Sequence, residues 1–142
     1  GGTVVVPRSD IDFGYRKAPR LENMVLTLAQ LQFDAGVKEE LGRSLEGILC
    51  RRSERQPLNH PSCGSVFKRP PGQYAGQLIE AAGLKGDRIG DAMVSPKHAG
   101  FIVNMGHATA ADVYRLIQRI EDRINRVFGI KLEREVKLVG KF

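Results

Sequence analysis

The sequence contains no tryptophan and has little aromatic character of any kind. Only 6% of its 142 residues are aromatic, which argues against a surface that stacks the bases of single-stranded nucleic acid. No apolar run is long enough to span a bilayer. The first seven residues also lack the charged start and apolar core of a signal peptide. We therefore expect no membrane association and a cytoplasmic location.

Cysteine and histidine are scarce as well. The two cysteines, Cys50 and Cys63, have no C-x-x-C spacing, and we expect both to be reduced thiols. The three histidines, His60, His98 and His107, are scattered and fit no known ligand spacing. The sequence therefore predicts no metal site.

Positive charge is abundant by comparison. The chain has 22 lysines and arginines against 16 acidic residues, which gives a net charge of +6. Such a balance suits nucleic acid or a phosphorylated small molecule as a partner. One hypothesis is therefore a non-catalytic basic module that binds nucleic acid or phosphorylated ligands, and net charge is its only support.

Hydrophobic periodicity predicts an extended first part and an α+β second part. Residues 24–33 alternate with both faces largely apolar, a pattern typical of a mostly buried strand. Residues 37–55 carry apolar side chains at helical spacing, and Pro57 follows. We therefore place a domain boundary between residues 34 and 56.

The second part interleaves helices with short strands. We expect helices at residues 73–82, ended by Gly83, and from a capping box at residues 109–112 to Gly129. We expect strands at residues 89–94, 101–105 and 130–139. The predicted fold class is α+β, with packed helices and a small mixed or antiparallel sheet.

Residues 61–72 join a glycine–serine pair to a proline-rich exit with two cations. Gly64 permits a sharp turn, and Pro70 and Pro71 bar a continuing helix. The hydroxyl of Ser65, held beside fixed positive charge, suits chemistry on an anion, and the alternative is an ordered surface loop. No G-x-S-x-G elbow surrounds Ser65, so a hydrolase triad is a poor explanation.

Two carboxylates near the C-terminus form a second candidate feature. Glu133 and Glu135 would lie on one strand face, about 7 Å apart. Either this face is solvated and balanced by Lys131 and Lys137, or one carboxylic acid points into a site where burial raises its pKa.

Isolated cations are further candidates. Arg16 is either a surface cation or a planar fork for a carboxylate or enolate oxygen. His98, together with Lys97, either binds an anion or caps a turn.

Seven segments, taken together and in order, resemble the shorter-type form of the UDP-N-acetylenolpyruvoylglucosamine reductase (MurB) family. They are residues 13–17 (FGYRK), 55–58, 61–70 (PSCGSVFKRP), 75–80, 83–86, 94–104 and 132–136 (LEREV). The resemblance covers nearly the whole chain and corresponds to the C-terminal portion of the family's proteins. A single such motif would be weak, but this many at suitable spacing are specific.

The resemblance implies reduction of UDP-N-acetylglucosamine enolpyruvate to UDP-N-acetylmuramate with FAD and NADPH, in peptidoglycan precursor synthesis. It implies that Ser65 protonates the carbon next to the site of hydride addition. It also implies that Arg16 and Glu135 stabilise the enolate-like intermediate, and so it selects Glu135 over Glu133. The implied substrate contacts are Tyr15, Arg69, Lys97 and His98.

The sequence also departs from the family pattern. The family's FAD-binding domain normally precedes this region, and its glycine-rich loops for the FAD pyrophosphate are absent here. Residues 1–36 would then be strands at the end of that domain, and residues 37–142 the substrate-binding domain, whose last strand returns towards it. Ala18 replaces a frequent serine, and Arg69 replaces a frequent asparagine. We expect the chain alone to be inactive without the FAD domain, its partner in the parent protein.

Overall fold

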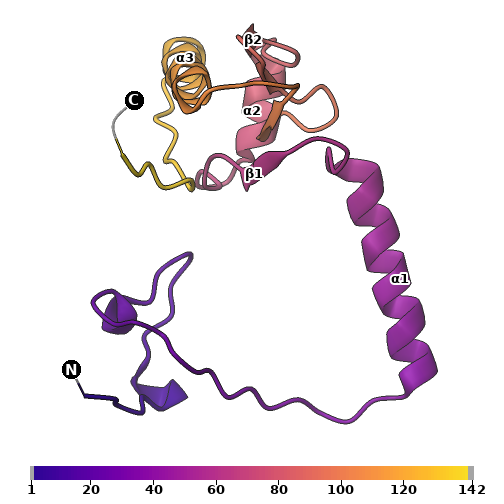
Figure 1. The fold of residues 1–142 in the computed structure, drawn as a ribbon, viewed down its shortest axis with the longest axis vertical. Coiled ribbons are helices and arrows are strands. Elements are labelled where there is room, and N and C mark those ends of the chain that lie inside the picture. Colours follow the sequence, from indigo (N-terminus) through magenta and orange to yellow (C-terminus); the bar gives the residue numbers. More distant parts are fainter. Residues whose placement is uncertain (1, 141–142) are drawn as a thin grey trace. The chain divides into compact units, whose positions relative to one another are not determined.

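The computed structural model describes residues 2–140 (Figure 1). Contacts between residues divide the chain into a first unit that ends at Val37 and a second unit that begins at Lys38. Of the described residues, all those in α-helices and in the strands of the sheet belong to the second unit.

The first unit has little regular structure. It contains two short 3₁₀-helices, η1 (Arg8–Asp10) and η2 (Pro19–Leu21). Between them lies a tight turn, in which the Gly14 amide donates to the Lys17 carbonyl at 2.9 Å and the Lys17 amide donates back at 3.2 Å. The turn therefore presents its two central residues, Tyr15 and Arg16, at its tip.

The buried strand predicted for residues 24–33 is not formed. These residues pair with no strand among the described residues, and neither do residues 3–6. Val25, Leu28 and Phe33 are 88%, 84% and 80% exposed. Apolar side chains on both faces of the predicted strand indicate that both faces favour burial. A strand also needs a neighbouring strand to bond its backbone N–H and C=O groups. Within the described part of the chain that partner is missing.

The second unit is built around a four-stranded antiparallel sheet in the order β1-β4-β3-β2. Its strands are β1 (Ser62–Ser65), β2 (Arg88–Ile89), β3 (Ala92–Val94) and β4 (Phe101–Asn104). The strand predicted at residues 101–105 is confirmed as β4. The single strand predicted at residues 89–94 is instead a hairpin, because Gly90, with φ 54°, opens a two-residue turn with Asp91.

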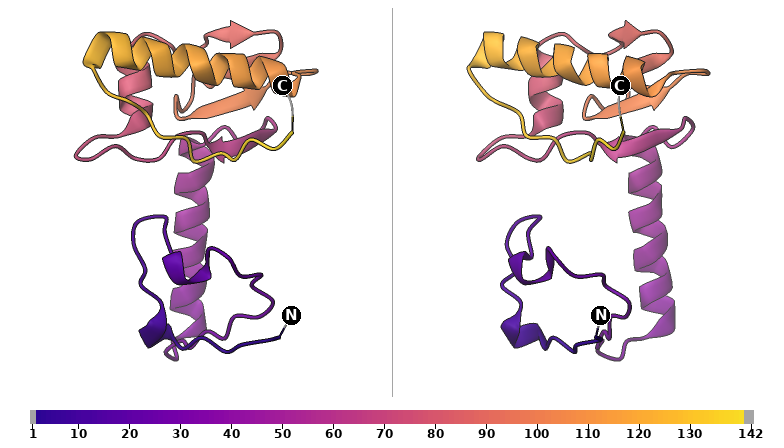
Figure 2. Two further views of the ribbon diagram at one scale, coloured as in Figure 1. Left: turned by 90° about the vertical axis from the view of Figure 1, so that its left-hand side faces the viewer. Right: turned by 60° about the vertical axis from the view of Figure 1, so that its left-hand side comes forward.

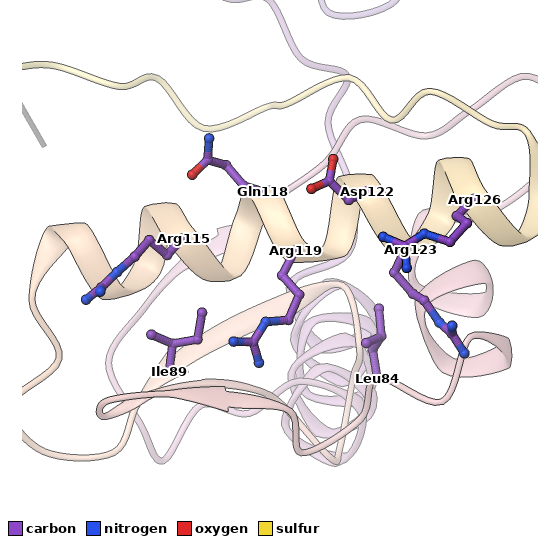
Figure 3. Close-up of a pocket in the computed structure, with 8 residues that line it drawn as sticks. All are labelled: Leu84, Ile89, Arg115, Gln118, Arg119, Asp122, Arg123 and Arg126. Atoms are coloured by element: carbon purple, nitrogen blue, oxygen red, sulfur yellow. The ribbon is translucent and has the colours of Figure 1, made fainter.

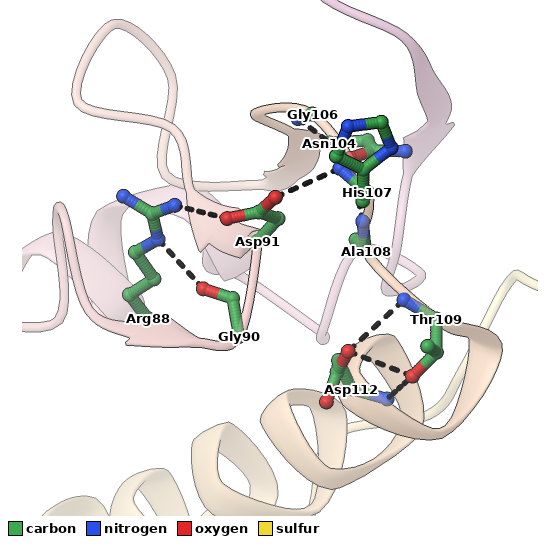
Figure 4. A network of polar contacts seen from close by, with 9 residues as sticks. All are labelled: Arg88, Gly90, Asp91, Asn104, Gly106, His107, Ala108, Thr109 and Asp112. Carbon is green, nitrogen blue, oxygen red and sulfur yellow. Dashed lines mark hydrogen bonds and ion pairs between the residues drawn. The ribbon is translucent and has the colours of Figure 1, made fainter.

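Both short-range helix signals in this unit are confirmed. α2 (Ala75–Ala81) ends in a Schellman motif: Gly83 has φ 75°, and the Leu84 amide donates to the Ile79 carbonyl at 3.1 Å. α3 (Ala110–Phe128) begins with the predicted capping box, in which Thr109 and Asp112 bond each other's amides (Figure 4). The helix ends at Gly129, which has φ 67°.

The core lies between the sheet and the two helices α2 and α3. α3 carries apolar side chains at helical spacing and runs across the sheet (Figure 2). Four of these side chains, those of Leu116, Ile117, Ile120 and Ile124, are fully buried. They pack in one cluster with side chains from α2, β3 and β4. This burial, repeated at helical spacing, explains why the pattern of α3 could be read from the sequence.

The opposite sheet face is also apolar. Phe101 and Val103 are buried yet stand outside that core cluster. In a strand, alternate residues point to opposite faces, so these two lie opposite Ile102, which belongs to the core. Met93 is the register partner of Val103, and the two form an apolar floor on this second face.

α1 (Lys38–Arg55) confirms the helix predicted at residues 37–55. Its apolar stripe, however, is not covered by any of the described residues. Leu41, Leu45, Ile48 and Leu49 are between 51% and 59% exposed. α1 is therefore an amphipathic helix whose apolar side is exposed to solvent among the described residues of this unit.

The final strand predicted at residues 130–139 is reduced to a single bridge, between Phe67 and Arg134. Leu132 is buried as the alternation predicted, but Leu138 is exposed. The segment runs beside the end of β1 (Figure 1). A few backbone hydrogen bonds hold it there in place of a full ladder.

Candidate active site

Ser65 stands at the end of β1, where three segments meet. Its register partner is Phe101 of β4. The next residue, Val66, donates its amide to the Gly100 carbonyl at 2.9 Å and accepts the Glu135 amide at 2.8 Å. Val66 thereby brings Ser65, the loop before β4 and the C-terminal segment together. Two of the three predicted catalytic residues thus lie on adjacent backbone.

The two candidate carboxylates differ in their surroundings. Glu133 is exposed and forms an ion pair with Lys68, whose amide also donates to the Glu133 carbonyl at 2.8 Å. Glu135 is partly buried and makes a further contact within the structure. The alternative of a solvated carboxylate balanced by a cation therefore fits Glu133, and one balancing cation is Lys68.

Between these carboxylates, Arg134 reaches to α3. Its Nε donates to Glu121 Oε1 at 2.6 Å, and its Nη2 bonds the other carboxylate oxygen. No sequence signal indicated this contact, because nothing in the LEREV motif relates Arg134 to a residue of the preceding helix.

Arg16 holds an unusual backbone conformation. Among the described residues it is the one non-glycine residue with positive φ, at 58°. A side chain in the left-handed region costs about 1–2 kcal/mol. The guanidinium lies 6.0 Å from the centre of the Tyr15 ring. Arg16 and Tyr15 belong to the first unit, whereas Ser65 and Glu135 belong to the second.

Arg69 follows the Ser65 strand and stacks on an aromatic ring. Its guanidinium carbon lies 3.9 Å from the centre of the Tyr74 ring. Stacking of this kind orients the planar fork. Tyr74 was not predicted as a site residue. Its position after a proline-rich turn carried no periodic signal.

Lys97 and His98 both contact the main chain. Lys97 Nζ donates to the Ser53 carbonyl at 2.7 Å, in the last turn of α1. His98 Nδ1 accepts the Gly100 amide at 3.1 Å, and its ring packs edge-on to Phe101 at 5.0 Å. This geometry matches the alternative in which His98 caps a turn.

A hollow of about 420 Å³ opens on the second sheet face. Met93 and Val103 line it from the sheet, Lys97 from the following loop, and Asn59 and His60 from the turn after α1. The lining combines an apolar floor with a few polar groups, as in small-molecule sites. The sequence could not place Asn59 or His60 here, since the turn has no motif of its own.

Cys63 lies two residues before Ser65. Desolvation raises the pKa of its thiol, although the residue as a whole is exposed. A raised pKa keeps the sulfur protonated near neutral pH, and the protonated thiol is a poor nucleophile. Thiolate chemistry at this loop is therefore disfavoured.

A second hollow, of about 490 Å³, lies along α3 and contains none of the predicted site residues (Figure 3). Four arginines of α3 line it above Leu84 and Ile89. Arg119 pairs with Asp87 at 3.0 Å, and Arg115 pairs with Asp112 at 2.6 Å. Two of the cations are thus balanced, and the groove has the character of an ordinary charged helix face.

The described residues contain neither a metal-binding cluster nor a membrane span. Within residues 2–140, no group of three or more His, Cys, Asp or Glu side chains could hold a metal ion. In the same range, no helix is both long enough and apolar enough to cross a membrane.

Comparison with known proteins gives one consistent result. The family model for the C-terminal domain of UDP-N-acetylenolpyruvoylglucosamine reductase matches residues 56–139. UDP-N-acetylenolpyruvoylglucosamine reductase 2 of Bacillus cereus is 46% identical over 92% of this chain and 43% of its own length. The reductase of Clostridium kluyveri is 43% identical over 99% of this chain and 47% of its own length.

A solved structure agrees with the sequence comparison. The crystal structure of UDP-N-acetylenolpyruvylglucosamine reductase (MurB) from Thermus caldophilus superposes with a TM-score of 0.68 and 36% identity. It covers 89% of this chain and 46% of that protein's chain. The chain therefore spans about half the length of the relatives it matches.

Proposed function

The chain belongs to the UDP-N-acetylenolpyruvoylglucosamine reductase family and matches the C-terminal domain of that family. On this basis we propose an activity for the full-length protein that contains the chain, its parent protein. The parent reduces UDP-N-acetylglucosamine enolpyruvate to UDP-N-acetylmuramate with FAD and NADPH, in the cytoplasm, during peptidoglycan precursor synthesis. The observation that carries the proposal is the main-chain junction at Val66, which sets Ser65 and Glu135 side by side.

In this proposal Ser65 donates a proton to carbon. Its hydroxyl is exposed at the end of a paired strand, so it can reach a substrate without moving the backbone. Glu135 and Arg16 act on the negative charge that develops at this same carbon and its carboxylate before the proton arrives. A fixed cation and a hydrogen-bonding group at developing charge stabilise such a transition state.

The strained backbone of Arg16 supports its proposed role. Residues in rare conformations cluster at functional sites, where the surroundings impose them. Glycine or asparagine would suit φ 58° better than arginine does. The presence of an arginine at this turn position is therefore consistent with a functional role for its guanidinium.

Substrate binding is proposed for three side chains of the second unit and one of the first. Arg69, oriented by its stacking on Tyr74, contacts the diphosphate. Lys97, at the rim of the 420 Å³ hollow, adds positive charge, and His98 adds a ring nitrogen. Tyr15, next to Arg16 in the turn, completes the proposed contacts.

FAD does not fit the residues of this chain by themselves. Residues 2–37 form no strand and no α-helix, and a flavin pyrophosphate needs a rigid backbone cradle. We propose that the rest of the parent protein holds FAD and NADPH, which supply the hydride. The uncovered apolar stripe of α1 is consistent with such a covering domain.

The alternative, a basic module for nucleic acid or phosphorylated ligands, has less support. The net charge of +6 still permits it, but two of the four arginines on α3 are neutralised by Asp87 and Asp112. Family membership favours the reductase.

The test uses the full-length parent protein. We expect the purified protein to be yellow and to oxidise NADPH only when UDP-N-acetylglucosamine enolpyruvate is added, as followed by the loss of NADPH absorbance. A mixture of short duplex and single-stranded DNA serves as the comparison ligand. A colourless protein without turnover that binds the DNA would overturn the proposal and favour the basic module.

A further inference from the structure

The segment that carries Glu135 has weak backbone pairing. Its main chain is hydrogen-bonded to the residues that follow Ser65. The Lys68 amide donates to the Glu133 carbonyl at 2.8 Å, and the Glu135 amide donates to the Val66 carbonyl at 2.8 Å. The Val136 amide makes a longer bond of 3.4 Å to the same Val66 carbonyl. Among the described residues only one bridge forms here, between Phe67 and Arg134. Such short pairing specifies register poorly, and a slip of one residue turns each side chain to the other face.

Side-chain contacts supply what the backbone lacks. Arg134 makes a two-point contact with Glu121, whose helix α3 is fixed by the core. The two side chains are only 27% and 22% exposed, so water screens the pair less than it would a surface pair. The guanidinium also lies 5.4 Å from the centre of the Tyr114 ring, another α3 side chain.

The Arg134 guanidinium keeps its charge at neutral pH and above. Hydrogen bonding to Glu121 raises the pKa of Arg134 further above its ordinary value. A planar fork that bonds both carboxylate oxygens fixes direction as well as distance. Arg134 therefore has one orientation, towards α3.

We propose that the Arg134–Glu121 pair is the positioning device for Glu135, an inference that rests on the proposed function. In an extended chain, neighbouring side chains point to opposite sides. With Arg134 held towards α3, Glu135 is directed to the other side, and a slipped register would break the pair. Another side-chain contact of the segment, between Lys68 and Glu133, is weaker, because Glu133 is 69% exposed.

The kinetic test uses the full-length protein and four variants. They are Arg134→Gln, Glu121→Gln, the double variant, and Arg119→Gln as a control that removes an α3 ion pair with no link to residues 133–136. Misplacement by about 1 Å costs up to about 100-fold in rate. We expect oxidation of the reduced flavin by the enolpyruvyl substrate to slow about 10- to 100-fold in both single variants, with KM changed less than about twofold.

Two comparisons sharpen this test. Flavin reduction by NADPH should keep its wild-type rate in every variant, because Glu135 takes no part in it. The double variant should be no slower than either single one, as expected for residues that act as one unit. Equal loss in both half-reactions, or multiplied losses in the double variant, would overturn the proposal.

Hydrogen exchange of the Glu135 amide provides a readout that does not depend on activity. This amide is bonded to Val66, so we expect it to exchange at least about tenfold faster in Arg134→Gln and Glu121→Gln, but not in Arg119→Gln. Unchanged protection would overturn the proposal even if turnover fell. If the wild-type protein shows no reductase activity, the proposed function fails, while the exchange result still decides whether the pair positions Glu135.

Discussion

The main-chain amide of Glu135 donates a hydrogen bond to the carbonyl oxygen of Val66 at 2.8 Å. Val66 itself is buried and follows Ser65 directly. Its amide is bonded on the other side to Gly100. Because main-chain bonds set the spacing of Ser65 and Glu135, their side chains can be replaced without removing the bonds that hold them.

Replacing Ser65 with alanine in the full-length protein should separate the two half-reactions. Loss of a positioned proton donor typically costs about 10²- to 10⁴-fold, so we expect oxidation of the reduced flavin by the enolpyruvyl substrate to slow by at least about 100-fold. Flavin reduction by NADPH should be unaffected. Stopped-flow absorbance of the flavin measures both rates.

Ser62→Ala is the matched control for this prediction. It removes a hydroxyl from the same strand, β1, at another exposed position. We expect wild-type rates in both half-reactions. If Ser65→Ala behaved like this control, Ser65 would not be the proton donor.

Replacing Arg16 with glycine should relieve strain and abolish function together. Arginine at φ 58° costs about 1–2 kcal/mol, and the added flexibility of glycine in the unfolded chain offsets about 0.4–1 kcal/mol of that. We expect stability to be unchanged or to rise by about 1 kcal/mol, while turnover falls by at least about 100-fold. Denaturant unfolding and NADPH consumption measure the two effects, with Lys17→Ala as control. A clear loss of stability would show that contacts of the Arg16 side chain stabilise the fold by more than the backbone strain costs.

The elements that could be predicted from sequence are those with local signals. Thr109 and Asp112 cap α3, Gly129 ends it, and its apolar stripe is buried almost as the pattern indicated. Each of these signals acts within one or two helical turns, so no distant partner is needed. The same holds for Gly83 after α2.

Strand predictions were less successful because strands depend on distant partners. Alternation over residues 24–33 and 130–139 indicated which side chains favour burial, but not whether a neighbouring strand exists. The hairpin at Gly90 was missed because two strands of two and three residues look like one longer strand.

The site shows a similar division between local and distant information. Ser65 and Glu135 are far apart in the sequence, so no periodicity could pair them. The local pattern of residues 61–72 indicated Ser65 as a candidate, and the family resemblance selected Glu135 over Glu133 and joined the two in one site. The contacts of Lys97 with Ser53, and of Arg134 with Glu121, join elements that only the fold brings together. Sequence reasoning therefore assigned anion binding to Lys97 without its structural contact, and it assigned no role to Arg134.

Replacing Lys97 with methionine should affect both α1 and substrate binding. The bond from Lys97 Nζ to the Ser53 carbonyl satisfies a main-chain group at a helix C-terminus, and its loss should cost about 1 kcal/mol. As a proposed diphosphate contact, Lys97 should also lower KM for the substrate. We expect KM to rise severalfold in Lys97→Met and to stay at the wild-type value in Lys131→Met. An unchanged KM in Lys97→Met would leave Lys97 a helix cap only.

Acid should destabilise the α+β unit through the carboxylates at the β2–β3 turn and the α3 cap (Figure 4). Hydrogen bonds from the Thr109 side chain and amide, and then from Arg115, hold the pKa of Asp112 below its ordinary value of 3.8. The His107 amide and Arg88 likewise lower the pKa of Asp91. A group with a depressed folded pKa contributes stability above its unfolded pKa, and this contribution is lost as pH falls through the folded pKa.

The free energy of unfolding of the wild-type chain should therefore fall below about pH 4. Asp112→Asn should be less stable than wild type at about pH 7, and the difference should shrink as pH drops from about 4 towards about 2, because protonated aspartate and asparagine then carry the same charge. Urea unfolding followed by circular dichroism at several pH values measures this difference. A difference that stays constant with pH would mean that Asp112 acts through geometry alone, and that its charge contributes nothing to the cap of α3.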